Sequence, residues 1–253
     1  MCGIWVSINF ESISEKFLSC IDHRGPDSTK LIQFDEKIYF GFNRLSIIDL
    51  NQRSDQPMVS SDRRFVIVFN GEIYNYKELR IQLEKLGYEF STQGDTEVLL
   101  NAFINWGEEC LNRLNGMFAF LVYDRHKRRL FASRDRFGIK PLYFYQNGDK
   151  IAFASEIKQF LELSSFPKKI NQERSIDFIC WRLFNHSNDT MWENVYQLRG
   201  GESVSLSLDE KKLVVRDNII KWYSYDRLMN LPTQNMSIND SANEFRKIFE
   251  KSI

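Results

Sequence analysis

Strand-like segments in the first 160 residues set the tightest limit on the fold. Residues 65–69 (FVIVF) are continuously apolar, as expected for a strand that is buried on both faces. Two hairpins are expected around the polar turns at 125–128 and 146–149, and the second turn contains an Asn-Gly pair that favours a tight reversal. Such short, closely spaced runs predict antiparallel sheets.

Two helices are expected to cover these sheets. Residues 76–86 are amphipathic and are followed by Gly87, a common helix stop, and residues 96–106 carry apolar side chains at helical spacing. The predicted class is therefore α+β, with two antiparallel sheets sandwiched between helical layers.

The composition changes after about residue 165. This change predicts a core at 1–165, a C-terminal part of the same domain at 166–228, and a linker with a first helix at 229–253. Within these parts we expect helices at 171–184 and 240–251, strands at 202–206 and 212–216, and a polar linker at 229–240. The apolar face of the last helix indicates either packing on this domain or a partner beyond it.

Charge and cysteine content exclude several classes of protein. The chain has 34 Lys and Arg residues against 34 Asp and Glu residues, so it has no basic excess for nucleic acid or an anionic membrane. No apolar run approaches the roughly 20 residues of a membrane helix, and the first ten residues lack the features of a secretory signal. The four cysteines are far apart, which predicts neither a zinc site nor disulfides and favours a cytoplasmic protein.

Cys2 is the strongest candidate for a catalytic group. A small second residue permits removal of Met1, which would give Cys2 a free α-amino group. That residue would then hold both a nucleophile and a base, because the ordinary pKa values are about 8.5 for a thiol and about 7.7–8.0 for an α-amine. The amine could accept the thiol proton directly or through one water, which activates the nucleophile without a histidine.

Three further motifs have ordinary structural interpretations when each is taken alone. Arg44 stands at the edge of an apolar run, where a surface ion pair would account for it. Asn70-Gly71 follows the buried strand and could supply two donors to an oxyanion, although the pair is also typical of a hairpin turn. Asp95 opens a helix, where it could simply satisfy free backbone N–H groups.

Taken together and in order, the motifs resemble those of the class II glutamine amidotransferases, the N-terminal nucleophile family. Within that family they are most similar to the glutaminase half of glutamine-dependent asparagine synthetase. The resemblance is close over most of residues 1–160 and looser over 161–253. The matching segments are MCGI at 1–4, HRGPD at 23–27, RLSI at 44–47, NGEIYN at 70–75, GDTE at 94–97, NGMFAF at 115–120, RDRFGIKPLY at 134–143 and ASEIK at 154–158.

The resemblance implies a four-layer αββα sandwich and a site for L-glutamine. It implies that Cys2 attacks the side-chain amide, while Asn70 and the Gly71 N–H form the oxyanion hole. Arg44 would bind the α-carboxylate as a planar donor fork, and Asp95 with Glu72 would hold the α-ammonium. The backbone of Leu45, Ser46, Ile47 and Ile48 would line the same pocket.

Asparagine synthetases continue into a second domain whose phosphate-binding loop reads Ser-Gly-Gly-x-Asp-Ser, and this sequence contains no such motif. We therefore expect no metal or cofactor in this chain. We expect ATP and Mg²⁺ to belong to a synthetase domain or subunit that receives the ammonia, and a homodimer is one assembly that the family would allow.

The acceptor of the ammonia stays open between aspartate, which would give asparagine, and a sugar or peptide carboxylate. A catalytically silent regulatory module and an acylase for different amides are two competing hypotheses. The presence of Cys2, Arg44, Asn70 and Asp95 argues against a silent module, and the Arg44–Asp95 pair argues against an acylase.

Overall fold

The structure is a computed structural model that describes residues 1–253 except 12, 211–212, 231–234 and 253. Contacts divide the chain into two compact units, Met1–Tyr223 and Ser224–Ile253. The second unit holds α6 (Asp226–Met229) and α7 (Ile238–Ser252). The boundaries expected at 165/166 and 228/229 stay predictions, and the sheets described next belong to the first unit.

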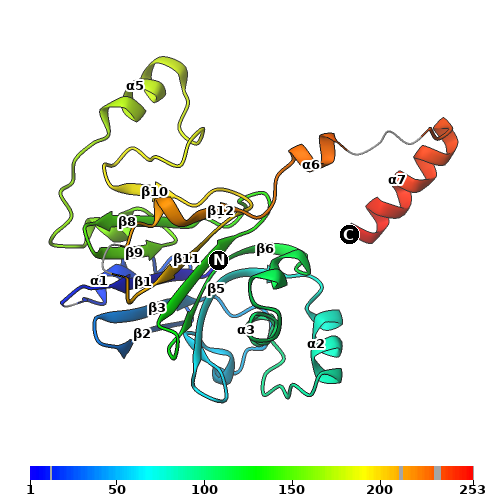
Figure 1. Ribbon diagram of the computed structural model, residues 1–253, viewed down its shortest axis with the longest axis horizontal. Coiled ribbons are helices and arrows are strands. Elements are labelled where there is room, and N and C mark those ends of the chain that lie inside the picture. The colour runs from blue at the N-terminus through cyan, green and yellow to red at the C-terminus, as the bar shows by residue number, and fades with distance from the viewer. Residues whose placement is uncertain (12, 211–212, 231–234, 253) are drawn as a thin grey trace. The chain divides into compact units, whose positions relative to one another are not determined.

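Two six-stranded sheets form the first unit (Figure 1), and each described strand pairing is antiparallel. The first sheet has the order β10 (Val195–Gln197), β8 (Tyr143–Asn147), β9 (Lys150–Ala154), β1 (Gly3–Ile8), β3 (Ile38–Arg44) and β2 (Ser28–Asp35). The second has the order β12 (Ile219–Lys221), β11 (Glu202–Ser207), β7 (Arg129–Arg134), β6 (Gly116–Asp124), β5 (Phe65–Ile73) and β4 (Met58–Val59). The two predicted hairpins are β6–β7 and β8–β9.

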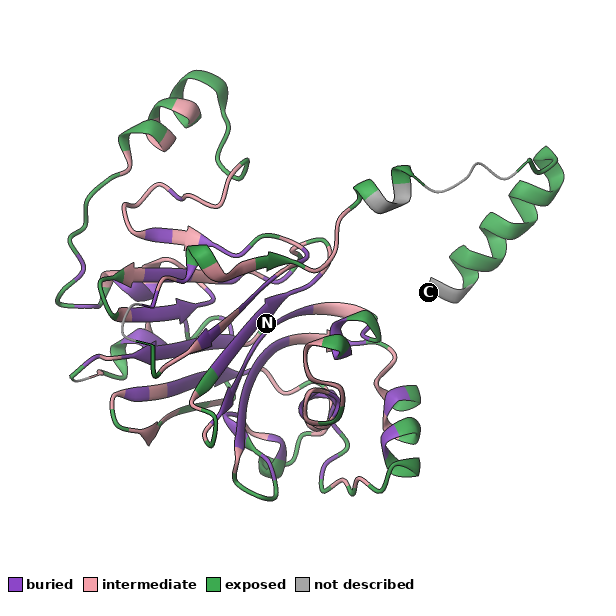
Figure 2. Cartoon of the chain, in the orientation of Figure 1, coloured by how far each residue is buried: buried purple, intermediate pink, exposed green. Residues whose placement is uncertain are grey.

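Helices cover the outer face of each sheet, which confirms the predicted four-layer αββα arrangement. Short helices α1 (Lys16–Ser19) and α4 (Lys158–Leu161) pack with the first sheet, and α2 (Tyr76–Lys85) and α3 (Asp95–Trp106) pack with the second. A third apolar cluster fills the space between the sheets. Figure 2 shows the central strands of both sheets as buried along most of their length.

Side-chain alternation explains why β5 is continuously apolar. Val66 and Val68 point into the cluster between the sheets, whereas Ile67 and Phe69 point into the cluster beneath α3. Because successive side chains of a strand face opposite sides, a strand in the middle of four layers must be apolar at every position. The strand predicted at 65–69 is therefore confirmed, and it extends to Ile73.

Three local predictions are corrected by the structure. The helix expected at 171–184 is α5 (Gln172–Trp181), which ends where Arg182 adopts a left-handed backbone with φ of 60°. The strand expected at 212–216 is not formed over the described residues 213–216; a 3₁₀ turn at Arg216–Asn218 leads instead into β12. Residues 70–71 do not form a hairpin turn, because they lie inside β5 and pair with β6.

The ends of the final helix also differ slightly from expectation. Helix α7 begins at Ile238, two residues before the predicted start, and part of the expected polar linker, 231–234, lies outside the described residues. Its apolar residues Phe245, Ile248 and Phe249 are exposed. Packing of this helix on the first unit, or on a partner beyond it, stays a prediction.

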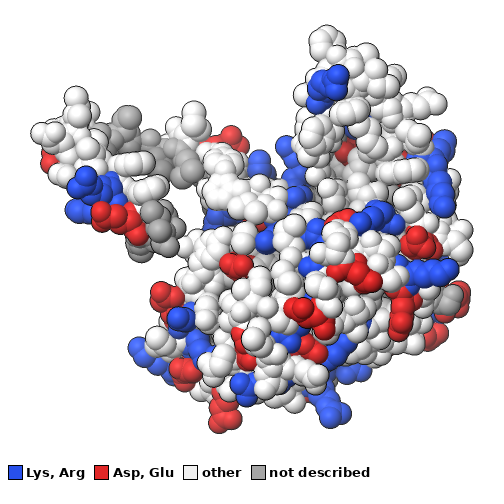
Figure 3. Space-filling model, turned by 180° about the vertical axis from the view of Figure 1, so that it is seen from behind, with Lys and Arg blue, Asp and Glu red and all other residues white. Residues whose placement is uncertain are grey.

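The surface carries mixed charge, in keeping with the balanced composition. On the face seen in Figure 3, basic and acidic side chains alternate over the sandwich, and the lobe that contains α5 is mostly uncharged. Several apolar side chains of this lobe are exposed, namely Ile176, Phe178, Ile179, Trp181, Leu183 and Phe184. None of the helices in the described part of the chain is long and apolar enough to cross a membrane.

Candidate active site

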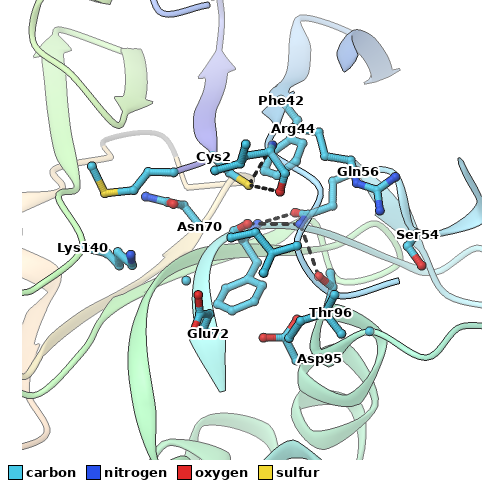
Figure 4. Close-up of a pocket in the computed structure, with 17 residues that line it drawn as sticks. Cys2, Phe42, Arg44, Ser54, Gln56, Asn70, Glu72, Asp95, Thr96 and Lys140 are labelled. Carbon is cyan, nitrogen blue, oxygen red and sulfur yellow. Dashed lines mark hydrogen bonds between the residues drawn. The ribbon is translucent and has the colours of Figure 1, made fainter. Parts of the chain in front are cut away.

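A pocket at the ends of β1, β3 and β5 and at the start of α3 gathers the predicted site residues (Figure 4). Only Ser46 of that set is outside its lining, and the Ser46 N–H donates to the Asp27 carboxylate at 2.6 Å. The lining residues are Met1, Cys2, Phe42, Arg44, Leu45, Ile47, Ile48, Ser54, Gln56, Phe69, Asn70, Gly71, Glu72, Gly94, Asp95, Thr96 and Lys140.

Cys2 directly precedes β1, the strand in the middle of the first sheet, and is held from two sides. The Leu45 N–H donates to its Sγ at 3.4 Å, and the Arg24 Nε donates to its carbonyl oxygen at 2.9 Å. Burial raises the pKa of the Cys2 thiol above its ordinary value, although the hydrogen bond with Leu45 opposes this. The thiol therefore needs a proton acceptor before it can attack.

The candidate acceptor is the N-terminal amine. No histidine lines the described pocket, and the nearby His23 is engaged by Glu156 at 3.0 Å. The nitrogen of Cys2 is tied in the peptide bond to Met1, so the free amine belongs to Met1. Burial is the main cause that lowers the pKa of this amine, and the cations of Arg24 and Lys140 lower it further, against the opposing effect of Cys2.

Asn70 and Gly71 present donors to the same space from β5. Asn70 is 1% exposed, and its side-chain Nδ2 is buried without a hydrogen-bond partner among the described residues. In Figure 4 its side chain lies between Cys2 and Lys140. Because a buried donor without a partner costs about 1–3 kcal/mol, its presence beside a nucleophile indicates a ligand oxygen that completes it.

Gly71 is required by the packing of β5 against β6. A Cβ atom at this position would lie 2.2 Å from the carbonyl oxygen of Met117 and 2.8 Å from the Cα of Phe118. The dipeptide that suggested a turn therefore serves close strand approach instead. This fit fixes the backbone that carries the Asn70 side chain.

Gln56 is a lining residue that the sequence did not reveal. Its Oε1 accepts the Phe69 N–H, and its Nε2 donates to the Phe69 carbonyl at 3.1 Å and to the Thr96 hydroxyl at 3.3 Å. The side chain thus pairs with β5 as a neighbouring strand would, one residue before Asn70. A lone glutamine in a polar segment carries no pattern that would have signalled this role.

Arg44 ends β3 with its guanidinium buried and partly engaged. Its Nη1 donates to the Asp55 carboxylate and the Asn51 carbonyl, and its Nη2 donates to the Asp49 carbonyl. Burial alone would raise the pKa of Asp55, but the bonds from Lys30 and Arg44 hold it below its ordinary value. Of the five guanidinium N–H donors, the described contacts leave Nε–H and one Nη2–H for a ligand, and guanidinium donors suit a carboxylate.

Asp95 and Glu72 supply the negative charge of the pocket. Asp95 is buried at the first position of α3, and its carboxylate accepts the Ile73 N–H at 3.0 Å. Burial raises the pKa of Asp95 to about 6, and the charge of Glu72 adds to this effect, while backbone hydrogen bonds oppose it. A cation bound between the two carboxylates would relieve this cost.

The pocket can therefore hold a ligand with one carboxylate, one ammonium and one polarised oxygen. Donors of Arg44 lie on one side, carboxylates of Glu72 and Asp95 on another, and the Cys2 thiol beside the Asn70 amide. Among the described residues there is no group of three or more His, Cys, Asp or Glu side chains suited to a metal ion.

The sequence also matches known proteins over much of its length. A family model described as "Glutamine amidotransferase domain" matches residues 1–217. The chain is 47% identical over 151 residues to asparagine synthetase [glutamine-hydrolyzing] 1 of Bacillus subtilis, covering 60% of this chain and 24% of that protein. It is 36% identical over 236 residues to a putative asparagine synthetase [glutamine-hydrolyzing] 2 of Methanocaldococcus jannaschii, covering 84% and 45%.

The fold also has a solved counterpart. The glutamine phosphoribosylpyrophosphate amidotransferase of B. subtilis superposes with a TM-score of 0.64 at 18% identity, over 88% of this chain and 49% of that one. At that identity the likeness concerns the fold alone. The chain spans between a quarter and just under half the length of the two synthetase relatives named above.

Proposed function

The chain belongs to the glutamine amidotransferase domain family, and on that premise we propose that it hydrolyses L-glutamine to glutamate and ammonia at Cys2. The observation that carries the proposal is the buried, unpartnered Asn70 Nδ2 in the pocket of the Cys2 thiol. Such a donor is suited to the negative oxygen that develops when a thiolate adds to an amide.

The polar groups of the pocket support glutamine as the substrate. The two free donors of Arg44 suit its α-carboxylate, and Asp95 with Glu72 suits its α-ammonium. These groups hold the amino-acid end, so the side-chain amide reaches toward Cys2. An amide without the zwitterionic end would leave a buried carboxylate unpaired, which disfavours it.

The proposed reaction begins after Met1 is removed. The Cys2 Sγ forms a bond to the amide carbon, and its proton passes to the Cys2 amine. The oxyanion is held by the Asn70 Nδ2 and the Gly71 N–H, and the protonated amine then gives its proton to the leaving nitrogen, so that ammonia departs. Water adds to the remaining γ-glutamyl thioester, the amine accepts its proton, and the thiol is restored as glutamate leaves.

We further propose that the ammonia is used by a synthetase domain or subunit that forms asparagine from aspartate. The relatives named as asparagine synthetases support this acceptor, and they are longer than the matched segment. ATP and Mg²⁺ would act in that synthetase part, because the glutaminase steps need neither. An acceptor with a sugar or peptide carboxylate is the alternative that the site leaves open, and a cytoplasmic location fits all of these roles.

The test is glutamate release from glutamine by the purified chain, with intact mass to establish that Met1 has been removed. Cys2→Ser should reduce release about 10³-fold or more, because a hydroxyl is a much weaker nucleophile than the thiol that it replaces. Cys180→Ser is the matched control, since Cys180 is exposed and lies outside the pocket, and it should keep full activity.

Hydroxylamine provides a second readout, because it competes with water for the thioester and yields a γ-glutamyl hydroxamate. Equal release by wild type and Cys2→Ser would contradict the proposal. No release by the Met1-free wild type, even with the synthetase part added, would assign a silent regulatory role instead.

A further inference from the structure

A rigid loop carries Lys140 into the pocket, and neither the fold nor the proposed reaction accounts for it. The loop follows β7 and is organised by the Asp135 carboxylate. This side chain is fully buried and, among the residues that the structure describes, accepts from four backbone N–H groups, those of Phe118 at 3.2 Å, Phe137 at 3.0 Å, Ile139 at 2.9 Å and Lys140 at 3.0 Å. Two of these bonds therefore fix the two residues at the end of the loop.

Arg134 fixes the same loop from the other side. Its guanidinium donates to three carbonyl oxygens, those of Gly138, Lys140 and Leu198, each at 2.6 Å. The loop reverses at Gly138, where φ is 67° and an added Cβ would meet the Arg134 guanidinium at 3.3 Å. The side chains of Arg134 and Asp135 thus both form hydrogen bonds with backbone groups, and together these bonds fix the position of Lys140.

The Lys140 side chain is buried and lines the pocket together with Met1 and Cys2. Across the described part of the chain, its ammonium makes no hydrogen bond and no ion pair. The other cations near Cys2 are neutralised: Arg24 pairs with Glu156 at 3.0 Å, and Arg44 pairs with Asp55. Lys140 therefore presents an uncompensated positive charge to the reactive end of the pocket.

The charged groups around the terminal amine decide what this cation can do. The Cys2 thiol and the cations of Arg24 and Lys140 act on the amine, and Arg24 is held by Glu156. Glu72, Asp95 and Arg44 occupy the rest of the lining. A positive charge close to an amine disfavours its protonation, which keeps a larger fraction of the amine able to accept a proton.

We propose that Lys140 is a positioning residue whose ammonium holds the N-terminal amine in its neutral, proton-accepting form. The inference rests on the proposed glutaminase, in which that amine is the base. Removal of Met1 transfers the free amine to the Cys2 nitrogen in the same pocket, so the cation acts on the group that receives the thiol proton.

The first experiment is the pH dependence of kcat/KM for Met1-free wild type, Lys140→Met and Lys140→Arg. Without the cation, the amine should become protonated at higher pH, so the acidic limb of Lys140→Met should move upward by about one pH unit. Lys140→Arg should keep the wild-type limb, because the charge is retained. Lys85→Met is the control, since Lys85 is exposed on α2 and outside the pocket.

A second measurement reads the amine without turnover. Trace acetylation across a pH series, followed by mass spectrometry of the N-terminal peptide, gives the pH at which the amine titrates. Lys140→Met should titrate higher than wild type, and Lys140→Gln replaces it if the methionine variant unfolds at a lower temperature. An unchanged amine titration in the folded variant overturns the inference.

The two readouts separate failure of the inference from failure of the proposed function. If the amine titrates at higher pH in Lys140→Met than in wild type, but wild type releases no glutamate, the role of Lys140 is retained and the glutaminase is rejected. Cys2-dependent release with an unshifted titration would do the reverse. A raised KM with an unmoved pH profile would assign Lys140 to substrate binding beside Glu72, which also overturns the inference.

Discussion

Asn70 and Arg44 line the same pocket, yet the structure leaves their donors in opposite states. The Asn70 amide is buried without a partner, whereas the Arg44 guanidinium already bonds to Asp55 and to two carbonyl groups of the loop that follows it. We call Cys2, Asn70 and Gly71 the reactive side of the pocket, and Arg44, Gln56 and Asp95 its recognition side.

This difference separates catalysis from stability. A donor that has no partner in the empty site does not stabilise the fold and costs free energy there, so it is available for the charge that appears during reaction. A side chain that is bonded in the empty site also holds the fold. Changes at Cys2 and Asn70 should therefore affect turnover with little loss of stability, whereas Gly71 is also needed for strand packing. Changes at Arg44 and Asp95 should affect both binding and the free energy of unfolding, and a change at Gln56 should affect turnover and the free energy of unfolding.

Among changes that leave the Cys2 thiol in place, the largest effect is expected for Asn70→Ala. Loss of the oxyanion donor should lower kcat about 10²–10³-fold, while the urea midpoint should not fall, because no hydrogen bond is lost and an unpaired buried donor is removed. Asn43→Ala is the matched control on neighbouring β3, where the amide donates to Asp22 at 3.2 Å and Thr29 at 3.1 Å. A greater loss of stability in Asn70→Ala than in Asn43→Ala would break the comparison.

Arg44→Lys should come next, because lysine keeps the charge but not the planar fork. We expect KM for glutamine to rise about 10–100-fold and the free energy of unfolding to fall by about 1–3 kcal/mol, since the buried Asp55 carboxylate and two carbonyls lose donors. Lys30→Met removes the other partner of Asp55, at 2.8 Å and outside the pocket. Lys30→Met should leave KM for glutamine unchanged. A rise in KM for Lys30→Met similar to that for Arg44→Lys would contradict the assignment of Arg44 as the carboxylate ligand.

Asp95→Asn should separate binding from stability in opposite directions. KM at pH 7.5 should rise about tenfold, because the α-ammonium loses a carboxylate, and the difference from wild type should narrow below about pH 6 as Asp95 itself becomes protonated. Initial rates at several glutamine concentrations across pH 5–8 measure this. An equal difference at both ends of the range would reject Asp95 as the ammonium ligand.

The same variant has a signed effect on stability. The folded pKa of Asp95, about 6, lies above its ordinary value of 3.8, so the folded state binds more protons and wild type loses stability as pH rises through this interval. Asp95→Asn should therefore have a free energy of unfolding about 1–3 kcal/mol higher than wild type at pH 7, seen as a higher urea midpoint. The two proteins should have the same stability near pH 3.5.

The smallest effect on turnover is expected for Gln56→Ala, because the Gln56 side chain fixes the position of β5 and does not touch the reacting atoms. Loss of its bonds to Phe69 should lower kcat about 5–20-fold and the free energy of unfolding by about 1–3 kcal/mol. Gln33→Ala removes an exposed hydrogen bond that the Gln33 side chain donates on β2, and it should change neither kcat nor the free energy of unfolding. Full activity in a destabilised Gln56→Ala would show that Asn70 is positioned without it.

The layers and most of the pocket could be predicted from the sequence, because both depend on strong local signals. Alternation and apolar runs located β5 and the two hairpins, and the motifs located Cys2, Arg44 and Asp95. The structure then brought these positions to one pocket, which their separation along the chain could not show. Their catalytic roles stay predictions until activity is measured.

Two of the misses, at 213–216 and at Gln56, share one cause, which is that a local pattern does not specify the partner of a segment. Val215 lies in a short apolar run and is buried, but the edge of β11 is paired by β12, and no strand forms at 213–216. Arg182 ends α5 in a left-handed conformation without the glycine that usually marks such an end. Gln56 acts through the backbone groups of Phe69, and nothing in its own short segment specifies that partner.

The middle position of β1 has a consequence for the order of events during synthesis. This strand pairs with β3 on one side and with β9 on the other, and the Ile4 N–H bonds to the Ser155 hydroxyl across 151 residues of sequence. At about 5–20 residues per second, a ribosome needs about 8–30 s to reach Ser155 after making Ile4. During that interval the N-terminus has only part of its sheet, so the proposed removal of Met1 could precede the pairing of β1 with β9.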